Sequence, residues 1–339
     1  MKKILLSFLI LVTILIGNPL TAMAEEMPSP ESFEKSIVEF IQSPSQKLPP
    51  NFLRLSDDIE ETVEDLGPLS ELAGTWVGKG WNMIAVPINS DSPSNIVGCP
   101  GKAASPEREN FCLEIMPYVE TLTFTPIGAP VPNRGFPINT FVVGLHYEQV
   151  VSDANTFQPL HIENGMWLLL DKKEKLVARL SSIPHGNSLL AIGKSFDLDG
   201  NFQINTIDGL PILEKPALGY ADPYFTVEGV APFVPSNPNQ ILQDVIDKQK
   251  LLKTVVLDVS TDNKGGISNI PFIEKNADVT SFKSTFWIEE VEDKRGNEFL
   301  QLQYSQTTDL DFIKDFTSTT EPKKLIVWPH VDVATLVKQ

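Results

Sequence analysis

The sequence predicts a mainly β protein, built either as a sandwich or as an up-and-down barrel. Many short segments are rich in β-branched and aromatic residues, and each is bounded by Gly, Pro, Asn or Asp. The segment 299–307 alternates apolar with polar side chains, as a half-buried antiparallel strand does. Many such segments separated by turn residues favour one of these two all-β architectures.

The expected strands follow one another from residue 75 almost to the end of the chain. A helical pattern is confined to the region before them and to one later interruption. The expected strand ranges are 75–81, 119–126, 140–150, 165–170, 176–181, 188–194, 254–260, 279–290, 298–307 and 324–337.

Residues 1–24 are typical of an export signal and are excluded from the fold. Two lysines precede an apolar run over 4–16, and residues 22–24, Ala-Met-Ala, form a small-x-small cleavage site. The apolar run is too short for a good transmembrane anchor. We therefore expect cleavage after residue 24 and release into the periplasm or the medium, without a stable membrane anchor.

The composition of the mature chain, 25–339, argues against negatively charged partners. Without Lys2 and Lys3 it has 25 basic residues against 44 acidic ones, a net charge near −19. Such a surface repels nucleic acid and anionic membranes.

The chain divides into a helical lead-in over 25–70 and one β domain over 71–339. Apolar residues three and four apart predict a helix within 32–41. A proline-rich stretch followed by a helix over 239–252 predicts an insertion at about 213–280. We expect this insertion to be too weakly apolar to build a core of its own.

The two cysteines, Cys99 and Cys112, flank a polar loop. In an exported chain they favour a disulfide that closes this loop. They lack metal-ligand spacing, and no Cys-x-x-Cys-His occurs, so covalent haem attachment is not expected.

Four histidines are the candidates for site chemistry. His146 and His161 lie in expected strands or at their edges, and His161 is followed two residues later by Glu163, which suits an imidazole oriented by a carboxylate. His185 lies in a Pro-His-Gly-Asn turn. A lone histidine in such a place is more often a satisfied polar group or a turn residue than a ligand.

His330 heads a β-branched run at the end of the chain. In a regular strand it shares a face with Asp332 and Ala334, whereas Val331 and Val333 make the more apolar opposite face. If His330 faces an interior, either a bulge near Pro329 turns it or both faces are buried there.

Motifs for several enzyme classes are absent from the sequence. It contains no His-Glu-x-x-His, no Gly-x-Ser-x-Gly, no phosphate-binding glycine loop and no dinucleotide fingerprint. Paired-carboxylate glycosidase chemistry stays open, although no residue pattern points to it.

Four segments, in order, resemble the nitrobindin family of small haem-binding barrels. Residues 72–80 resemble its opening Leu-x-Gly-x-Trp-x-Gly-x-Gly, and 159–167 resemble its Met-His-x-Glu-x-Gly-aromatic motif. Residues 299–307 resemble its penultimate strand, and 329–338 its closing Pro-His-Leu-x-Ala-x-Leu-Lys. This chain is longer than the family's compact members and adds a signal peptide and an insertion.

The resemblance implies a ten-stranded antiparallel up-and-down barrel of the calycin type that binds haem b. It makes His330 the proximal iron ligand, with His161 and His146 as candidate cofactor contacts on the other side. It also implies peroxide or reactive nitrogen species as substrates, through peroxidase-like or peroxynitrite isomerase chemistry. The alternative is a non-enzymatic carrier of a hydrophobic small molecule, similar to lipocalins and fatty-acid-binding proteins.

Overall fold

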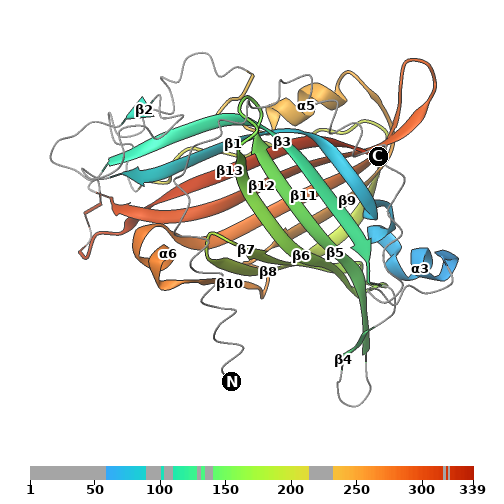
Figure 1. The fold of residues 1–339 in the computed structure, drawn as a ribbon, viewed down its shortest axis with the longest axis horizontal. Coiled ribbons are helices and arrows are strands. Elements are labelled where there is room, and N and C mark those ends of the chain that lie inside the picture. The colour runs from blue at the N-terminus through green and yellow to red at the C-terminus, as the bar shows by residue number, and fades with distance from the viewer. Residues whose placement is uncertain are drawn as a thin grey trace, which may run out of the picture. The chain divides into compact units, whose positions relative to one another are not determined.

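Ten antiparallel strands close into an up-and-down barrel in the computed structural model (Figure 1). Each barrel strand pairs with the next barrel strand in the sequence, and β1 closes the ring by also pairing with β13. The ten strands are β1 Gly74–Ile88, β3 Asn110–Pro126, β5 Thr140–Asp153, β6 Pro159–Asp171, β7 Leu176–Ile183, β8 Asn187–Asp199, β9 Lys250–Ser260, β11 Asp278–Glu292, β12 Glu298–Lys314 and β13 Leu325–Lys338. Each of the ten predicted segments is therefore confirmed as a barrel strand.

The structure describes part of the chain, all of it within the unit Asn51–Gln339. The predicted signal peptide, the predicted helix over 32–41 and Cys99 lie outside the described residues. The described ranges are 59–88, 101–102, 110–127, 131–133, 140–213, 232–315, 318–319 and 321–339.

Short elements complete the described parts. None of the helices among them is long and apolar enough to cross a membrane. These elements are the strands β2 Gly101–Lys102, β4 Val131–Asn133 and β10 Gly266–Asn269, and the helices α3 Ile59–Leu66, η1 Gly67–Leu72, α5 Gln240–Ile246 and α6 Pro271–Asn276.

The helical segment before β1 packs against one end of the barrel interior. Leu69 and Leu72 of η1 are fully buried in the same apolar cluster as Trp76, Trp167 and Leu336. The Trp76 indole Nε1 donates a hydrogen bond of 2.8 Å to the Leu72 carbonyl. This end of the interior is therefore filled by side chains.

The outer wall of the barrel carries a second apolar cluster, which includes residues of the predicted insertion. Leu242 and Ile246 of α5 are buried against Trp287 and Val333 on the outer face of β11 and β13. The described part of the insertion therefore shares a core with the sheet, on the outside of the barrel. The predicted helix over 239–252 ends at Ile246, and β9, a barrel strand, begins at Lys250 inside the predicted insertion.

The orientation of His330 follows from this second cluster. Ala334 and Leu336, which share its face, belong to the interior cluster, whereas Val331 and Val333 belong to the outer one. No register shift occurs at Pro329 in the pairing of β12 with β13. Both faces of β13 are buried, and His330 faces the interior without a bulge.

Candidate functional site

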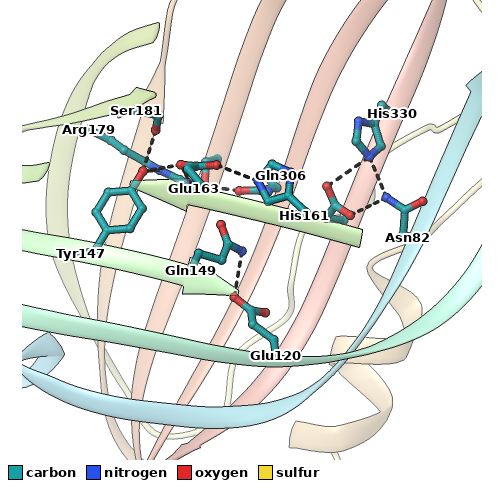
Figure 2. Close-up of polar contacts among 12 residues, drawn as sticks. Asn82, Glu120, Tyr147, Gln149, His161, Glu163, Arg179, Ser181, Gln306 and His330 are labelled. Carbon is teal, nitrogen blue, oxygen red and sulfur yellow. Dashed lines mark hydrogen bonds and ion pairs between the residues drawn. The ribbon is translucent and has the colours of Figure 1, made fainter. Parts of the chain in front are cut away.

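A cross-strand group around His330 forms the centre of the candidate site. Asn82 of β1 lies directly opposite Asp332 of β13, so these two side chains share the inner face with His330. Asn82 Nδ2 donates a hydrogen bond of 2.8 Å to Asp332 Oδ1 and lies 2.7 Å from His330 Nε2. Asp332 Oδ2 lies 3.3 Å from the same Nε2, and Figure 2 shows these contacts together.

The hydrogens on Asn82 fix the tautomer of a neutral His330. An amide nitrogen can only donate, so Nε2 accepts this hydrogen bond and the ring proton resides on Nδ1. Burial alone would raise the pKa of Asp332, but the positive charge of a protonated His330 ring, its hydrogen bond and the Asn82 hydrogen bond outweigh burial and hold this pKa below its ordinary value. Asp332 is therefore a carboxylate, and it is ready to accept a ring N–H.

A second polar group lies on β6 and β7, deeper in the barrel. The fully buried Arg179 donates a hydrogen bond of 2.8 Å to Glu163 Oε1, and Tyr147 donates to the same oxygen. His161 Nε2 lies 3.4 Å from the other Glu163 oxygen. Burial would raise the pKa of Glu163, but the Arg179 guanidinium outweighs it and keeps this carboxyl ionised.

Three of the four histidines lie near one another at one end of the barrel, with His185 in the exposed turn between β7 and β8. The rings of His161 and His185 stack with their centroids 5.4 Å apart. Burial lowers the pKa of His185, and the charges of His161 and His330 lower it further. The electrostatic influence of His161 also reaches Asp332. The structure thus brings His161, His185 and His330 into one electrostatic neighbourhood.

His146 is not brought into this group. Along β5, Leu145 and Tyr147 point inward and are buried, whereas His146 lies between them on the exposed outer face. The side chain of Cys112 is buried in β3. Its predicted partner Cys99 lies outside the described residues, so the disulfide stays a prediction.

A third polar group contains a carboxyl without a cation. Glu120 accepts hydrogen bonds of 2.6 Å from Tyr304 and 2.8 Å from Gln149, and Tyr304 also contacts Tyr118. Burial raises the pKa of Glu120 to about 7, because these neutral partners only partly offset it. Within the described part of the chain, the buried Gln149 Oε1 has no hydrogen-bond partner.

Two glycines of the resembling motifs make room for these polar groups. A Cβ atom at Gly80 would overlap the Tyr118 ring, and one at Gly165 would overlap the Tyr147 ring and the Leu180 carbonyl. The motif spacing therefore has a packing reason, since both tyrosines occupy the space that a side chain would need.

Several site residues were missed by the sequence interpretation. Asn82, Arg179 and Glu120 were not singled out, and Asp332 was noted only for its strand face. The sequence could have pointed to Arg179, because it is the single charged residue in the strand Leu176–Ile183. Asn82 becomes recognisable only when the register places it opposite Asp332, and Glu120 only when the fold brings it to the Tyr304 and Gln149 side chains.

The residues around His330 fit a haem iron. An imidazole on an inner barrel face, with a carboxylate beside it to orient the ring, is a common arrangement for a metal-bound histidine. His330 is about a quarter exposed, which leaves part of the ring accessible to a ligand.

Comparison with known proteins finds a family model that matches part of the chain. Residues 65–211 match the family model of the THAP4-like, heme-binding beta-barrel domain. The match spans β1 to β8, so β9 to β13 and His330 lie beyond it. No curated protein matches the chain.

One solved structure among those that match is the crystal structure of Rv2717c from M. tuberculosis. It is 16% identical, and the match covers 84% of this chain and 99% of that chain with a TM-score of 0.40. Residues 65–211, less than half of the chain, are thus similar to the THAP4-like, heme-binding beta-barrel domain family.

Proposed function

We propose that the barrel binds haem b without a covalent link and that His330 is the proximal iron ligand. The observation that carries this proposal is the inward position of His330 beside the Asp332 carboxylate. The match of residues 65–211 to a haem-binding domain family supports the cofactor. The lack of a Cys-x-x-Cys-His motif in the sequence favours non-covalent haem.

The proposed reaction is the conversion of peroxide or a reactive nitrogen species. Bound haem would supply an iron centre that binds and activates such small oxidants. His161 is suited to hold or move a proton at its Nε2, since Glu163 orients this nitrogen and the ring is about a quarter exposed. The Arg179–Glu163 ion pair keeps that orienting carboxylate charged.

Titration of the mature chain with haemin tests the cofactor and its ligand. Wild type is expected to give a Soret band that saturates at one haemin per chain, and His330→Ala is expected to lose or shift this band. His146→Ala is the matched control, because it removes an imidazole from the exposed outer face. No band at stoichiometric haemin, or an unchanged band in His330→Ala, would overturn the proposal and favour a carrier of another hydrophobic molecule.

The proposed role of His161 requires a separate experiment. The rate at which haem-loaded His161→Gln reacts with hydrogen peroxide is expected to fall about 10²- to 10⁴-fold relative to wild type, the range for loss of a general acid–base group. The Soret position before reaction should stay that of wild type. Equal rates in wild type and His161→Gln would leave His161 with a structural role in orienting Glu163 only.

We also propose that the chain is exported, on the strength of the signal pattern over residues 1–24. Expression of the full chain in a bacterial host, followed by fractionation and intact-mass measurement, tests this. Export predicts a product in the periplasm or medium whose mass corresponds to a chain beginning at Glu25. An unprocessed product that stays in the cytoplasm would contradict it.

A further inference from the structure

Two neighbouring groups compete for one ring nitrogen of His330. Asn82 Nδ2 lies 2.7 Å from Nε2, and Asp332 Oδ2 lies 3.3 Å from it. The two competitors also bind each other, because Asn82 donates to the second Asp332 oxygen at 2.8 Å. Their backbone positions are paired directly across β1 and β13, so neither can drift away from the ring.

The two contacts require different states of the ring. Asn82 donates, so it needs a lone pair on the ring nitrogen that it touches. The Asp332 oxygen beside the ring accepts, so it needs an N–H on the ring nitrogen that it faces. A neutral imidazole has one lone pair and one N–H, so a single nitrogen can satisfy only one of these partners.

Binding of iron changes which partner is favoured. A metal takes the lone pair of one ring nitrogen, and the single ring proton then lies on the other nitrogen. That N–H needs an acceptor, which Asp332 provides and the Asn82 amide nitrogen does not. The ring would meet this need by moving its proton to Nε2, or by a half-turn that points Nδ1–H at Asp332, and in either case the other ring nitrogen would be left to hold the metal. The number of ring protons is one before and after.

We propose that Asn82 and Asp332 form an exchange pair: Asn82 holds the His330 ring in the ligand-free protein, and Asp332 holds it when iron is bound. This inference rests on the proposed haem site. It makes Asp332 a positioning residue that strengthens the bond from His330 to iron, and it makes Asn82 a competitor of the cofactor. The charge on Asp332 also stabilises ferric over ferrous iron, because negative charge beside the ligand favours the more positive metal.

The pair predicts opposite effects from two residues that hydrogen-bond each other. Asp332→Ala is expected to weaken haemin binding about 10- to 100-fold, the usual effect of losing the partner of a metal-bound histidine. Asn82→Ala is expected to leave haemin binding equal to wild type or several-fold tighter. A merely structural pair would weaken binding in both variants. Asp309→Ala is the control, since this carboxyl lies one position away on the outer face of β12 and should change nothing.

The reduction potential gives a readout that does not depend on activity. Asp332→Asn keeps the shape but removes the charge, so the potential of the bound haem is expected to rise. Asp332→Glu, which restores the charge, is expected to recover most of the wild-type potential. Circular dichroism and the thermal midpoint of each haem-free variant show whether it is folded before the titration.

The haem-free half of the proposal has its own test in the ¹⁵N NMR shifts of His330. The wild-type ring is expected as the neutral Nδ1–H tautomer, and Asn82→Ala is expected to shift the population toward Nε2–H. An Nε2–H ring in wild type overturns the role of Asn82. If His330→Ala loses the Soret band but Asp332→Ala and Asp332→Asn match wild type, the role of Asp332 is overturned and the haem site stands. If wild type binds no haemin, the haem site and the iron-bound half of the pair both fall.

Discussion

Two buried glutamates, one inside the barrel and one on its outer wall, ionise in opposite ways. Glu163 faces the interior and is 2% exposed, and Glu289 lies under the inserted segment and is 0% exposed. Glu163 has a pKa well below its ordinary range, whereas burial raises the pKa of Glu289 to about 8. Burial is the same, so it does not account for the difference.

The difference lies in the partners of each carboxyl. Glu163 accepts from the Arg179 guanidinium, whereas the hydrogen bond found for Glu289 comes from the neutral Gln301 amide at 2.7 Å. Glu120 shows that the interior itself is not the cause, because it lies inside the barrel with neutral partners and its pKa is also raised. A cation in direct contact therefore decides which buried carboxyl stays charged here.

Removal of that cation should have the largest effect. Arg179→Met is expected to lower the free energy of unfolding by about 3–5 kcal/mol at pH 7, because it leaves Glu163 buried and uncompensated. Urea unfolding followed by circular dichroism measures this change.

A double variant separates the lost charge from lost packing. Adding Glu163→Gln to Arg179→Met removes the stranded charge and is expected to recover at least half of the lost stability. An Arg179→Met variant within 1 kcal/mol of wild type would show that the pair contributes little and that the comparison of Glu163 with Glu289 is mistaken.

Because its pKa is raised and not lowered, Glu289 should make the protein less stable as the pH rises, the opposite of what Glu163 does. The pKa of Glu289 in the folded protein lies above its unfolded value of about 4.5. The protonated carboxyl therefore contributes fully to the free energy of unfolding below pH 4.5, and this contribution is lost as the pH rises through about 8. Glu289→Gln removes this loss, and by pH 8.5 the variant is expected to gain about 2 kcal/mol relative to wild type. Urea unfolding at pH 4.5, 6.5 and 8.5 measures the trend, and equal gains at all three values would contradict it.

Glu120 should show a smaller form of the same effect. Its folded pKa is about 7, so its contribution is lost between about pH 4.5 and 7. Glu120→Gln is expected to gain about 1 kcal/mol at pH 8 relative to pH 4.5. The new amide can donate to the Gln149 Oε1 once the Gln149 side chain turns over. If Glu120→Gln instead loses stability at pH 8, the carboxyl is charged in the folded state.

The sequence was sufficient to predict the strands but not what lies on each side of them. Period-two patterns and turn residues located all ten barrel strands, because these signals are local. The face of His330 was harder to assign, since Val331 and Val333 are the more apolar pair and yet point outward. They are buried there because residues far away in the chain, among them Leu242 and Ile246 of α5, join them in the outer cluster.

The candidate site shows the same limit. His330 and His161 were found through motifs, each of which lies within one strand. Their partners Asn82 and Arg179 come from other strands and depend on register, which no local pattern in this chain specifies. The residues at 330, 332 and 334 share the inner face of β13.

An ion pair at the surface completes the comparison with the smallest expected effect. Lys250 and Glu292 lie opposite each other on β9 and β11 with 2.9 Å between Nζ and Oε2, but the lysine side chain is 63% exposed. Water screens this pair, so Lys250→Ala is expected to change the free energy of unfolding by less than about 0.5 kcal/mol, against 3–5 kcal/mol for Arg179→Met. Urea unfolding in 0.05 and 0.5 M NaCl measures both variants. If Lys250→Ala lowers the free energy of unfolding as much as Arg179→Met does, losing the cation of an ion pair has the same cost inside the barrel and at its surface. Burial of the carboxylate left behind would then not explain the cost of breaking the Arg179–Glu163 pair.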